Sequence, residues 1–334
     1  METQIELPAI PKENAFNAIR LFLCFVVVFM HSLGNVGISN KYLLDGHMAV
    51  CGFFVISGFW ITKSYFNSEN LKVFFLKRIK KILPMYYISV IGFSIFCLCF
   101  SEMTPNDYFG LKYFKYLFWN CIFLNFMHPS LPGCFNGSAV NGALWTIKIE
   151  IGFYIILPVI ILILKKIKSN IGKNLFFTVL YILSVLYNLI LKLYAVKWHL
   201  PHQLEHQLPG FISFFVVGMF IFLNWNLFLR LKNRLILPAI AIYVLHYFTN
   251  TEILFPIALS VIIVWAALLL KKLNCIGKDI DFSWGIYLFH FPIMQILFYS
   301  VNGNVNIPVY ATSVLGISFM FTFVIEKYLQ KKIK

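Results

Sequence analysis

Long apolar runs dominate the chain, and short polar segments separate them. Ten runs approach 20 residues, the length that an α-helix needs to cross a bilayer. The pattern therefore predicts an all-α integral membrane protein with about ten transmembrane helices, in one membrane-embedded domain over residues 1–334. The predicted spans are residues 16–34, 47–66, 83–100, 142–164, 174–194, 208–229, 235–249, 252–270, 281–300 and 307–329.

Two further segments are amphipathic and are expected to lie at the membrane surface. Residues 69–84, "ENLKVFFLKRIKKILP", interleave apolar and basic side chains, which is typical of an amphipathic helix on the inner surface. Residues 107–126 are rich in aromatic side chains, which favour the interface between lipid and water. The second segment is expected at the outer interface, because a span there would reverse every later helix.

The basic residues orient the predicted helices. Cytoplasmic loops of membrane proteins carry an excess of Lys and Arg. If both termini are cytoplasmic, that side collects all of the 28 basic residues except Lys41, Lys112, Lys115, Lys148, Lys192 and Lys197. The first 14 residues mix acidic and basic side chains, unlike a signal peptide, so the first run is expected to remain as a transmembrane helix.

Composition supports a membrane protein and excludes a nucleic-acid partner. The chain is 60% hydrophobic, 18% aromatic and only 12% charged, which is unlike a soluble domain of this size. Its net charge of +15 is spread in short clusters between apolar runs, as in membrane loops, and not over one face. The lipid bilayer is therefore the expected surrounding of the chain.

The first apolar run carries an arginine and a histidine on one helix face. Arg20 and His31 are separated by about three helical turns, so their side chains point the same way. Arg20 is placed at the cytoplasmic end, and His31 lies toward the outer half. An anion site and a base on one face is one interpretation. An arginine that reaches the membrane boundary and an interhelical hydrogen-bonded histidine are the alternatives.

Two more polar positions lie at membrane depth. Glu150 is the one acid well inside an apolar run, and such carboxylates usually face a polar cavity with a cationic or histidine partner. A buried pairing without a catalytic role is its alternative. Ser57 precedes Gly58 in mid-span, where small residues let helices approach closely. Ser57 as a nucleophile is the weaker interpretation, because the usual G-x-S-x-G setting is missing.

The remaining histidines need separate readings. His290 lies just before Pro292, where a packed histidine that bonds a freed backbone carbonyl is the simplest interpretation. The segment "HQLEH" at 202–206 fits a zinc-peptidase pattern, but two prolines bracket it in a short outer loop. It is therefore interpreted as a polar loop near a substrate entrance, and no metal is expected.

Five segments together resemble acyltransferase family 3, membrane proteins that O-acylate surface and exported glycans. They are "NAIRLFLCFVVVFMHS" (17–32), "FFVISGF" (53–59), "KRIKKILPMYY" (77–87), "LWTIKIEIGFYIILP" (144–158) and "SWGIYLFHFP" (283–292), and the terminal "VIEKY" also fits. One departure is Lys81, which stands where the family usually has a second arginine, so a bidentate phosphate contact there becomes a point charge. No counterpart of the SGNH domain of some members is recognised, so a partner-dependent second step is expected to come from another protein.

The resemblance implies an enzyme of the bacterial cytoplasmic membrane that takes an acyl group, most often acetyl, from cytoplasmic acyl-CoA. The acceptor would be a hydroxyl of a surface or lipid-linked glycan, such as lipopolysaccharide O-antigen, capsule or exopolysaccharide. Arg20, Arg78 and Lys81 would bind the coenzyme phosphates, and acetyl-CoA is the expected donor. His31 would be the general base, with Glu150 orienting its ring. The other residues expected in the substrate pocket are Ser57, Trp145, Tyr287 and His290.

Two alternatives remain open at this stage. An acetyl group carried covalently by His31 is an alternative mechanism. A proton-coupled transporter or flippase of a glycan precursor is the alternative function, with Arg20, Glu150 and His31 as a proton relay. That class would predict transport without acyl-CoA.

Overall fold

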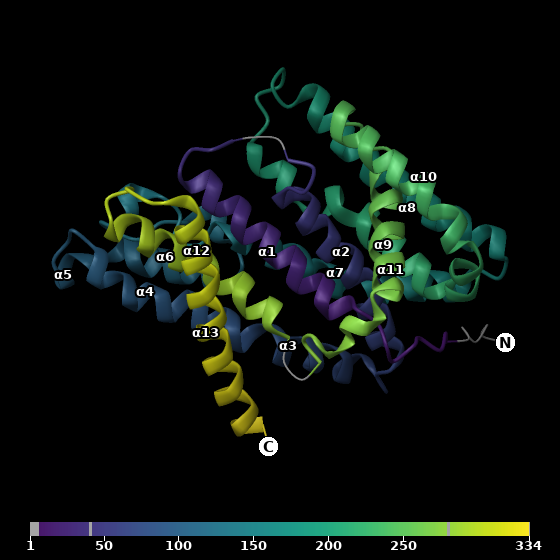
Figure 1. Cartoon of the computed structure of the whole chain (residues 1–334), viewed down its shortest axis with the longest axis horizontal. Helices are drawn as coiled ribbons and strands as arrows, with labels where there is room; N and C mark the ends of the chain where they lie inside the picture. Colours follow the sequence, from purple (N-terminus) through teal and green to yellow (C-terminus); the bar gives the residue numbers. More distant parts are fainter. Residues whose placement is uncertain (1–6, 40–41, 279–280, 334) are drawn as a thin grey trace. The chain divides into compact units, whose positions relative to one another are not determined.

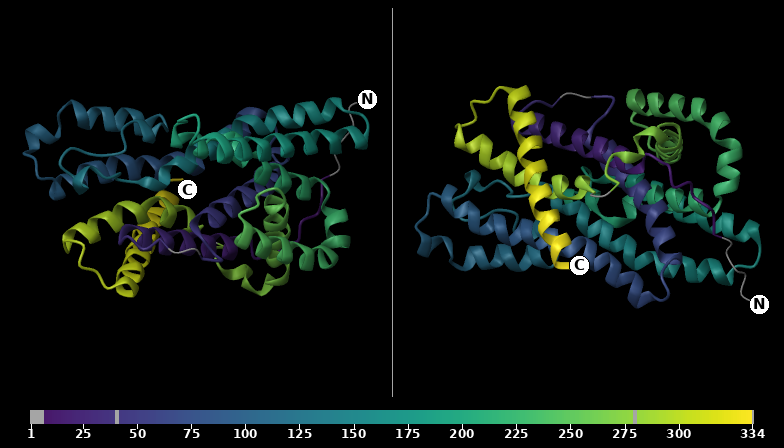
Figure 2. Two further views of the ribbon diagram at one scale, coloured as in Figure 1. Left: turned by 90° about the horizontal axis from the view of Figure 1, so that it is seen from above. Right: turned by 60° about the horizontal axis from the view of Figure 1, so that its bottom comes forward.

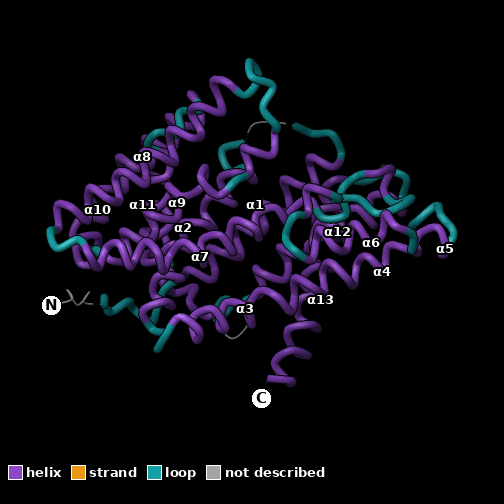
Figure 3. Tube along the Cα trace, turned by 180° about the vertical axis from the view of Figure 1, so that it is seen from behind, coloured by secondary structure: helices purple, strands orange, loops and turns teal. Residues whose placement is uncertain are grey.

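A computed structural model describes residues 7–39, 42–278 and 281–333. All regular structure in these ranges is helical, and no strand occurs among them (Figures 1 and 3). Apolar runs of this length leave only one way to satisfy their backbone groups in lipid, namely hydrogen bonds inside each segment. The predicted all-α class is confirmed.

The helices follow the apolar runs closely. The long helices are α1 Phe16–Asn35, α2 Gly46–Phe66, α3 Leu71–Tyr87, α7 Trp145–Lys166, α8 Asn170–Tyr194, α9 Leu208–Leu223, α10 Trp225–Thr249, α11 Phe255–Leu269, α12 Phe282–Ser300 and α13 Ile307–Ile333. The short ones are α4 Phe93–Phe96, α5 Pro105–Tyr108 and α6 Leu111–Cys121.

Among the described residues, seven helical segments are long and apolar enough to cross a membrane, so the chain is a multi-pass integral membrane protein. They are Phe16–Asn35, Gly46–Phe66, Leu71–Phe100, Phe135–Lys166, Asn170–Tyr194, Gln203–Leu223 and Ile307–Leu329. The count of ten spans, the cytoplasmic termini and the single domain over residues 1–334 stay predictions.

The structure between residues 71 and 100 differs from the two separate helices that the sequence predicts there. The sequence predicts a surface helix over 69–84 and a separate span over 83–100. The structure instead has one continuous helical segment, in which α3 passes through Pro84 into a π-helical turn at Ile88–Gly92, then α4, then a 3-10 turn at Cys97–Phe100. The helix continues past Pro84 because a proline removes one hydrogen bond but does not prevent helical backbone angles.

The break between the sixth and seventh apolar runs also differs from the prediction. It lies at Asn224, where α9 ends and α10 begins, and not in the basic stretch near residue 232. The backbone N–H of Asn224 donates to the carbonyl of Phe220 at 2.9 Å, and its side-chain amide donates to the same oxygen at 3.0 Å, which caps the end of α9. Lys and Arg are good helix formers, so the basic cluster lies inside α10 without ending it.

The aromatic segment over 107–126 does not form a long helix. It contains α5 and the 11-residue α6, which is far shorter than the thickness of a bilayer. A short helix with many aromatic side chains fits the interface that was predicted for it.

The chain forms two compact units, which are described one at a time. The first contains residues up to Ile19 together with Val50–Arg78 and Ile149–Ile276. The second contains Arg20–Ala49, Ile79–Lys148 and the residues from Gly277 onward.

In the first unit, α2 and α9 cross at two glycines. A Cβ atom at Gly58 would overlap the carbonyl oxygen of Phe215, and one at Gly218 would overlap the carbonyl oxygen of Val55. Beside this crossing, the ring of Phe153 from α7 stacks on Phe215 with centroids 4.3 Å apart. The predicted role of Gly58, close helix approach, is confirmed.

In the second unit, α12 and α13 pack along each other as consecutive helices (yellow-green and yellow in Figure 2). A Cβ atom at Gly285 would press against Thr322 of α13, so this contact also requires a small residue. The other side of α12 faces α1, where the thiol of Cys24 donates to the backbone carbonyl of Ser283 at 3.4 Å. The chain thus places its first helix and its second-to-last helix together.

Candidate active site

One face of α1 carries three polar side chains that contact α12 or the residue just before it. Arg20 contacts Asp281, which immediately precedes α12; Cys24 contacts the backbone of Ser283, and His31 contacts His290. The two helices therefore run in the same direction along this contact. The prediction that Arg20 and His31 share one face of the first helix is confirmed.

His31 and His290 form a close pair joined through their ring nitrogens. Nδ1 of His31 lies 2.8 Å from Nε2 of His290, and the ring planes differ by only 7° with centroids 5.1 Å apart. The side chain of Phe291 packs edge-on against His31 at 5.3 Å. His290 is completely buried, so the pair is held by protein on the His290 side.

The second ring nitrogen of His290 is bonded to the backbone of its own helix. Nδ1 lies 2.8 Å from the carbonyl oxygen of Tyr287 and 3.2 Å from that of Ile286. The hydroxyl of Tyr287 in turn forms a hydrogen bond of 2.9 Å with Thr146. The sequence predicted Tyr287 and His290 as residues of the substrate pocket, but it did not predict the bond between His290 and His31 or the contact of Tyr287 with Thr146.

Pro292 frees a carbonyl in α12, as the sequence predicts, but His290 does not bond it. A proline at this position leaves the carbonyl of Leu288, four residues earlier, without its helical donor. Asn141 donates to that oxygen at 2.8 Å and Ser89 donates at 3.1 Å. Two other segments of the second unit therefore satisfy the carbonyl, and His290 remains available for His31.

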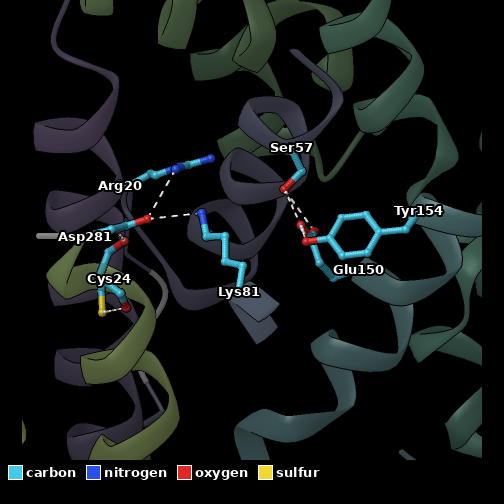
Figure 4. A network of polar contacts seen from close by, with 8 residues as sticks. Arg20, Cys24, Ser57, Lys81, Glu150, Tyr154 and Asp281 are labelled. Carbon is cyan, nitrogen blue, oxygen red and sulfur yellow. Dashed lines mark hydrogen bonds and ion pairs between the residues drawn. The ribbon is translucent and has the colours of Figure 1, made fainter. Parts of the chain in front are cut away.

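At the other end of the same helix pair, two cations share one carboxylate (Figure 4). Nη1 of Arg20 and Nζ of Lys81 each lie 3.4 Å from Oδ2 of Asp281. The hydroxyl of Ser283 donates to the other oxygen, Oδ1, at 2.5 Å. Sequence reasoning missed Asp281, although an acid directly before an apolar run, with a serine two residues later, marks a helix start.

Arg78, the third predicted phosphate ligand, belongs to the first unit. Its guanidinium lies 5.9 Å from the centre of the Tyr154 ring. Its Nε is buried and has no hydrogen-bond partner within the described ranges. The structure therefore brings Arg20 and Lys81 together, and the grouping of Arg78 with them stays a prediction.

In the first unit, two hydroxyl groups hold the carboxylate of Glu150 (Figure 4). Ser57 of α2 lies 3.0 and 2.9 Å from its two oxygens, and the hydroxyl of Tyr154 lies 2.9 Å from Oε1. Such donors stabilise an ionised carboxylate away from water. Tyr154 was missed by the sequence reasoning, although it stands one turn after Glu150. The prediction that Glu150 orients the ring of His31 stays a prediction.

Two other predicted positions are placed more simply. Trp145 is the first residue of α7 and is half-buried. The segment His202–His206 forms a 3-10 helix, not the α-helix that a zinc-peptidase pattern needs to place its ligands on one face.

Comparison with known proteins identifies the class of protein that carries this site. Residues 13–327 match the family model Acyl_transf_3, described as an acyltransferase domain. That range includes α1, α12 and both polar networks. The chain belongs to this acyltransferase family and is a membrane acyltransferase.

Three relatives are informative about the family. The chain is 23% identical to an O-acetyl transferase of Shigella phage Sf6 over 330 residues, which cover 95% of the chain and 96% of the relative. It is 26% identical to Nodulation protein 10 of Rhizobium leguminosarum bv. viciae over 169 residues, 46% of the chain and 45% of that protein. A protein of Bacillus subtilis (strain 168), provisionally named a peptidoglycan O-acetyltransferase, is 22% identical over 84% of the chain and 48% of its own length. No solved structure matches the chain.

Proposed function

We propose that the protein transfers an acyl group, most often acetyl, from cytoplasmic acyl-CoA to a hydroxyl of a surface or lipid-linked glycan. The observation that carries this proposal is the shared face of α1. It holds an arginine near one end, which contacts Asp281 just before α12, and a histidine about three turns further along, which contacts His290 of α12. Coenzyme A has a matching shape, with an anionic head and a long thin arm that ends in the thioester.

The cationic end suits the phosphates of the donor. Arg20 and Lys81 place two positive charges at this end of the helix pair, where both contact the carboxylate of Asp281. A guanidinium binds phosphate through paired N–H donors, and an ammonium binds it as a point charge. Arg78, three residues before Lys81 along the chain, is proposed as a further phosphate ligand.

His31 would activate the acceptor. The acceptor hydroxyl loses its proton to the imidazole as its oxygen attacks the thioester carbon, and the carbon–sulfur bond then breaks. The proton passes from the imidazolium to the departing coenzyme thiolate. The products are the O-acylated glycan and free coenzyme A, and the histidine returns to its starting state.

The glycan class rests on the names of the relatives together with the resemblance. The phage relative is named an O-acetyl transferase, and the provisional name of the Bacillus relative refers to peptidoglycan. A hydroxyl acceptor fits a site with a histidine base, since a hydroxyl must lose its proton as it attacks. The bacterial cytoplasmic membrane is the proposed location, because it separates the donor from exported glycans.

The test compares cells that express wild-type protein with cells that express His31→Ala. Mass spectrometry of their surface glycans measures the acetyl increment, and purified protein with radiolabelled acetyl-CoA measures turnover. Loss of a general base lowers the rate by about 10²–10⁴-fold. His128→Ala is a matched control, because His128 is a half-buried histidine of the same unit outside the His31–His290 pair. Normal turnover by His31→Ala would refute the proposed role of this residue.

A further inference from the structure

We infer that His290 is a positioning residue that fixes the tautomer of His31, so that Nδ1 of His31 carries the proton and Nε2 carries the lone pair. This inference rests on the proposed role of His31 as a base. It follows from the order of hydrogen bonds in the second unit, which runs from the backbone of α12 through His290 to His31.

The first step is the tautomer of His290. Its Nδ1 faces the carbonyl oxygens of Tyr287 and Ile286, and a carbonyl oxygen only accepts hydrogen bonds. Nδ1 of His290 must therefore carry a hydrogen. A second hydrogen on Nε2 would place a full charge on a ring with 0% exposure, and burying an unpaired ion costs several kcal/mol. His290 is thus neutral, and its Nε2 is an acceptor.

The second step is the tautomer of His31. Nδ1 of His31 lies 2.8 Å from the acceptor Nε2 of His290, so His31 must be the donor in this bond. A neutral imidazole has one N–H, which leaves the lone pair on Nε2 of His31. The identity of the protonated nitrogen in a catalytic histidine is set in this way by the bond that its other nitrogen makes.

The third step is the rigidity of the pair. The two ring planes are only 7° apart, so the hydrogen bond joins the rings edge to edge and fixes the orientation of His31 as well as its proton. On the far side, the ring of Tyr287 lies against His290 with centroids 5.8 Å apart and is anchored through its hydroxyl to Thr146. His290 therefore performs, with a neutral ring, the orienting task that an acid performs in a triad.

The test uses the full-length protein in detergent or nanodiscs, labelled with ¹⁵N-histidine. The chemical shifts of the ring nitrogens report which nitrogen carries the proton, and the spectrum of His31→Gln assigns the signals of His31. We expect a single Nδ1–H tautomer in the wild type. In His290→Phe we expect a mixture of tautomers, whereas His290→Gln, whose amide oxygen can accept from Nδ1, retains most of the Nδ1–H form. His128→Gln is the control and leaves the His31 signals unchanged.

Kinetics provide the second readout. His290→Phe is expected to lower kcat by about 10²–10⁴-fold, the range for a base in the wrong tautomer, with less than about a twofold change in the KM for acetyl-CoA. His290→Gln is expected to recover at least about tenfold of that loss, and the thermal midpoint of each variant checks its folding.

The two proposals can fail separately. An Nε2–H tautomer of His31 in the wild type, or an unchanged Nδ1–H tautomer in a folded His290→Phe, would overturn the inference even if His31→Ala is inactive. Conversely, His31→Ala could transfer acetyl groups normally while the wild type shows the expected tautomers. That result would overturn the role of His31 as a base, but the inferred direction of the hydrogen bonds would still hold.

Discussion

Arg20 and Asp281 form an ion pair, with Nη1 3.4 Å from Oδ2, and Lys81 approaches the same oxygen at the same distance. The side chains of Arg20 and Asp281 are 17% and 27% exposed, so the pair is partly shielded from water. An ion pair in this position has two effects. It holds the cations in place when the donor is absent, and it competes with a donor phosphate for them.

Removal of the guanidinium is expected to weaken donor binding. Arg20→Ala should raise the KM for acetyl-CoA by about 10–100-fold, since hydrogen bonds to charged groups contribute about 1.5–3 kcal/mol each. Arg20→Lys should restore part of this loss, because an ammonium cannot form the paired contact of a guanidinium. Titration of acetyl-CoA at saturating acceptor measures the effect. An effect confined to the acceptor would contradict the phosphate role.

Removal of the carboxylate is expected to act in the opposite direction. Asp281→Asn frees Arg20 and Lys81 from their shared anion, so the KM for acetyl-CoA should fall by a few-fold and become more sensitive to salt. The thermal midpoint should also fall, because two neighbouring cations then repel each other. Asp107→Asn, at an exposed acid of the same unit, is the control. A rise in KM would mean that Asp281 holds the cations in the geometry that the donor needs.

Substitution of Ser57 distinguishes two roles for this residue: a hydrogen-bond donor to Glu150, or a catalytic nucleophile. Ser57→Ala removes one donor from a carboxylate that keeps Tyr154, so we expect a loss of about 1–3 kcal/mol in stability and less than about a tenfold change in kcat. Tyr154→Phe should have a similar effect. Complete loss of turnover in Ser57→Ala, with Tyr154→Phe active, would instead indicate a serine nucleophile. Single-turnover assays with radiolabelled donor distinguish these results.

The crossing of α2 and α9 makes a prediction about stability alone. Gly58→Ala places a methyl group against the carbonyl of Phe215, and relief of this overlap requires the two helices to separate. We expect a loss of about 1–3 kcal/mol, measured as a lower thermal midpoint in detergent. Gly316→Ala in α13 is the control, because no atom lies within 4 Å of its added Cβ and alanine favours helix. Equal midpoints for the two variants would contradict the close crossing.

The sequence predicted what depends on helical periodicity and missed what depends on contacts between distant segments. The shared face of Arg20 and His31 followed from the spacing alone. Asp281 was missed because an acid beside an apolar run looks like an ordinary helix start, and its pairing with Lys81 joins segments about 200 residues apart. The partner of His31 within the second unit could not be read from the sequence either, since nothing along the chain joins His31 to His290.

The boundaries that the sequence misplaced have a common physical cause. Proline and clustered charges were interpreted as the ends of helices near Pro84 and Arg230. Both lie inside helices in the structure, because a proline removes only one backbone hydrogen bond and long basic side chains favour helical backbone. Local composition therefore predicted the positions of the apolar runs well, but it predicted the ends of the helices poorly.

The π-helical turn at Ile88–Gly92 is equivalent to one residue inserted into an α-helix. Ser89 lies in this turn and donates to the carbonyl that Pro292 frees. A relative that lacks one residue here would wind α3 as an uninterrupted α-helix, and every side chain from Phe93 onward would rotate by about 100°. We therefore expect two features to vary together in the family. Members that lack one residue within positions 88–92 should also lack Pro292, or should lack Ser89 and its hydrogen bond to the freed carbonyl.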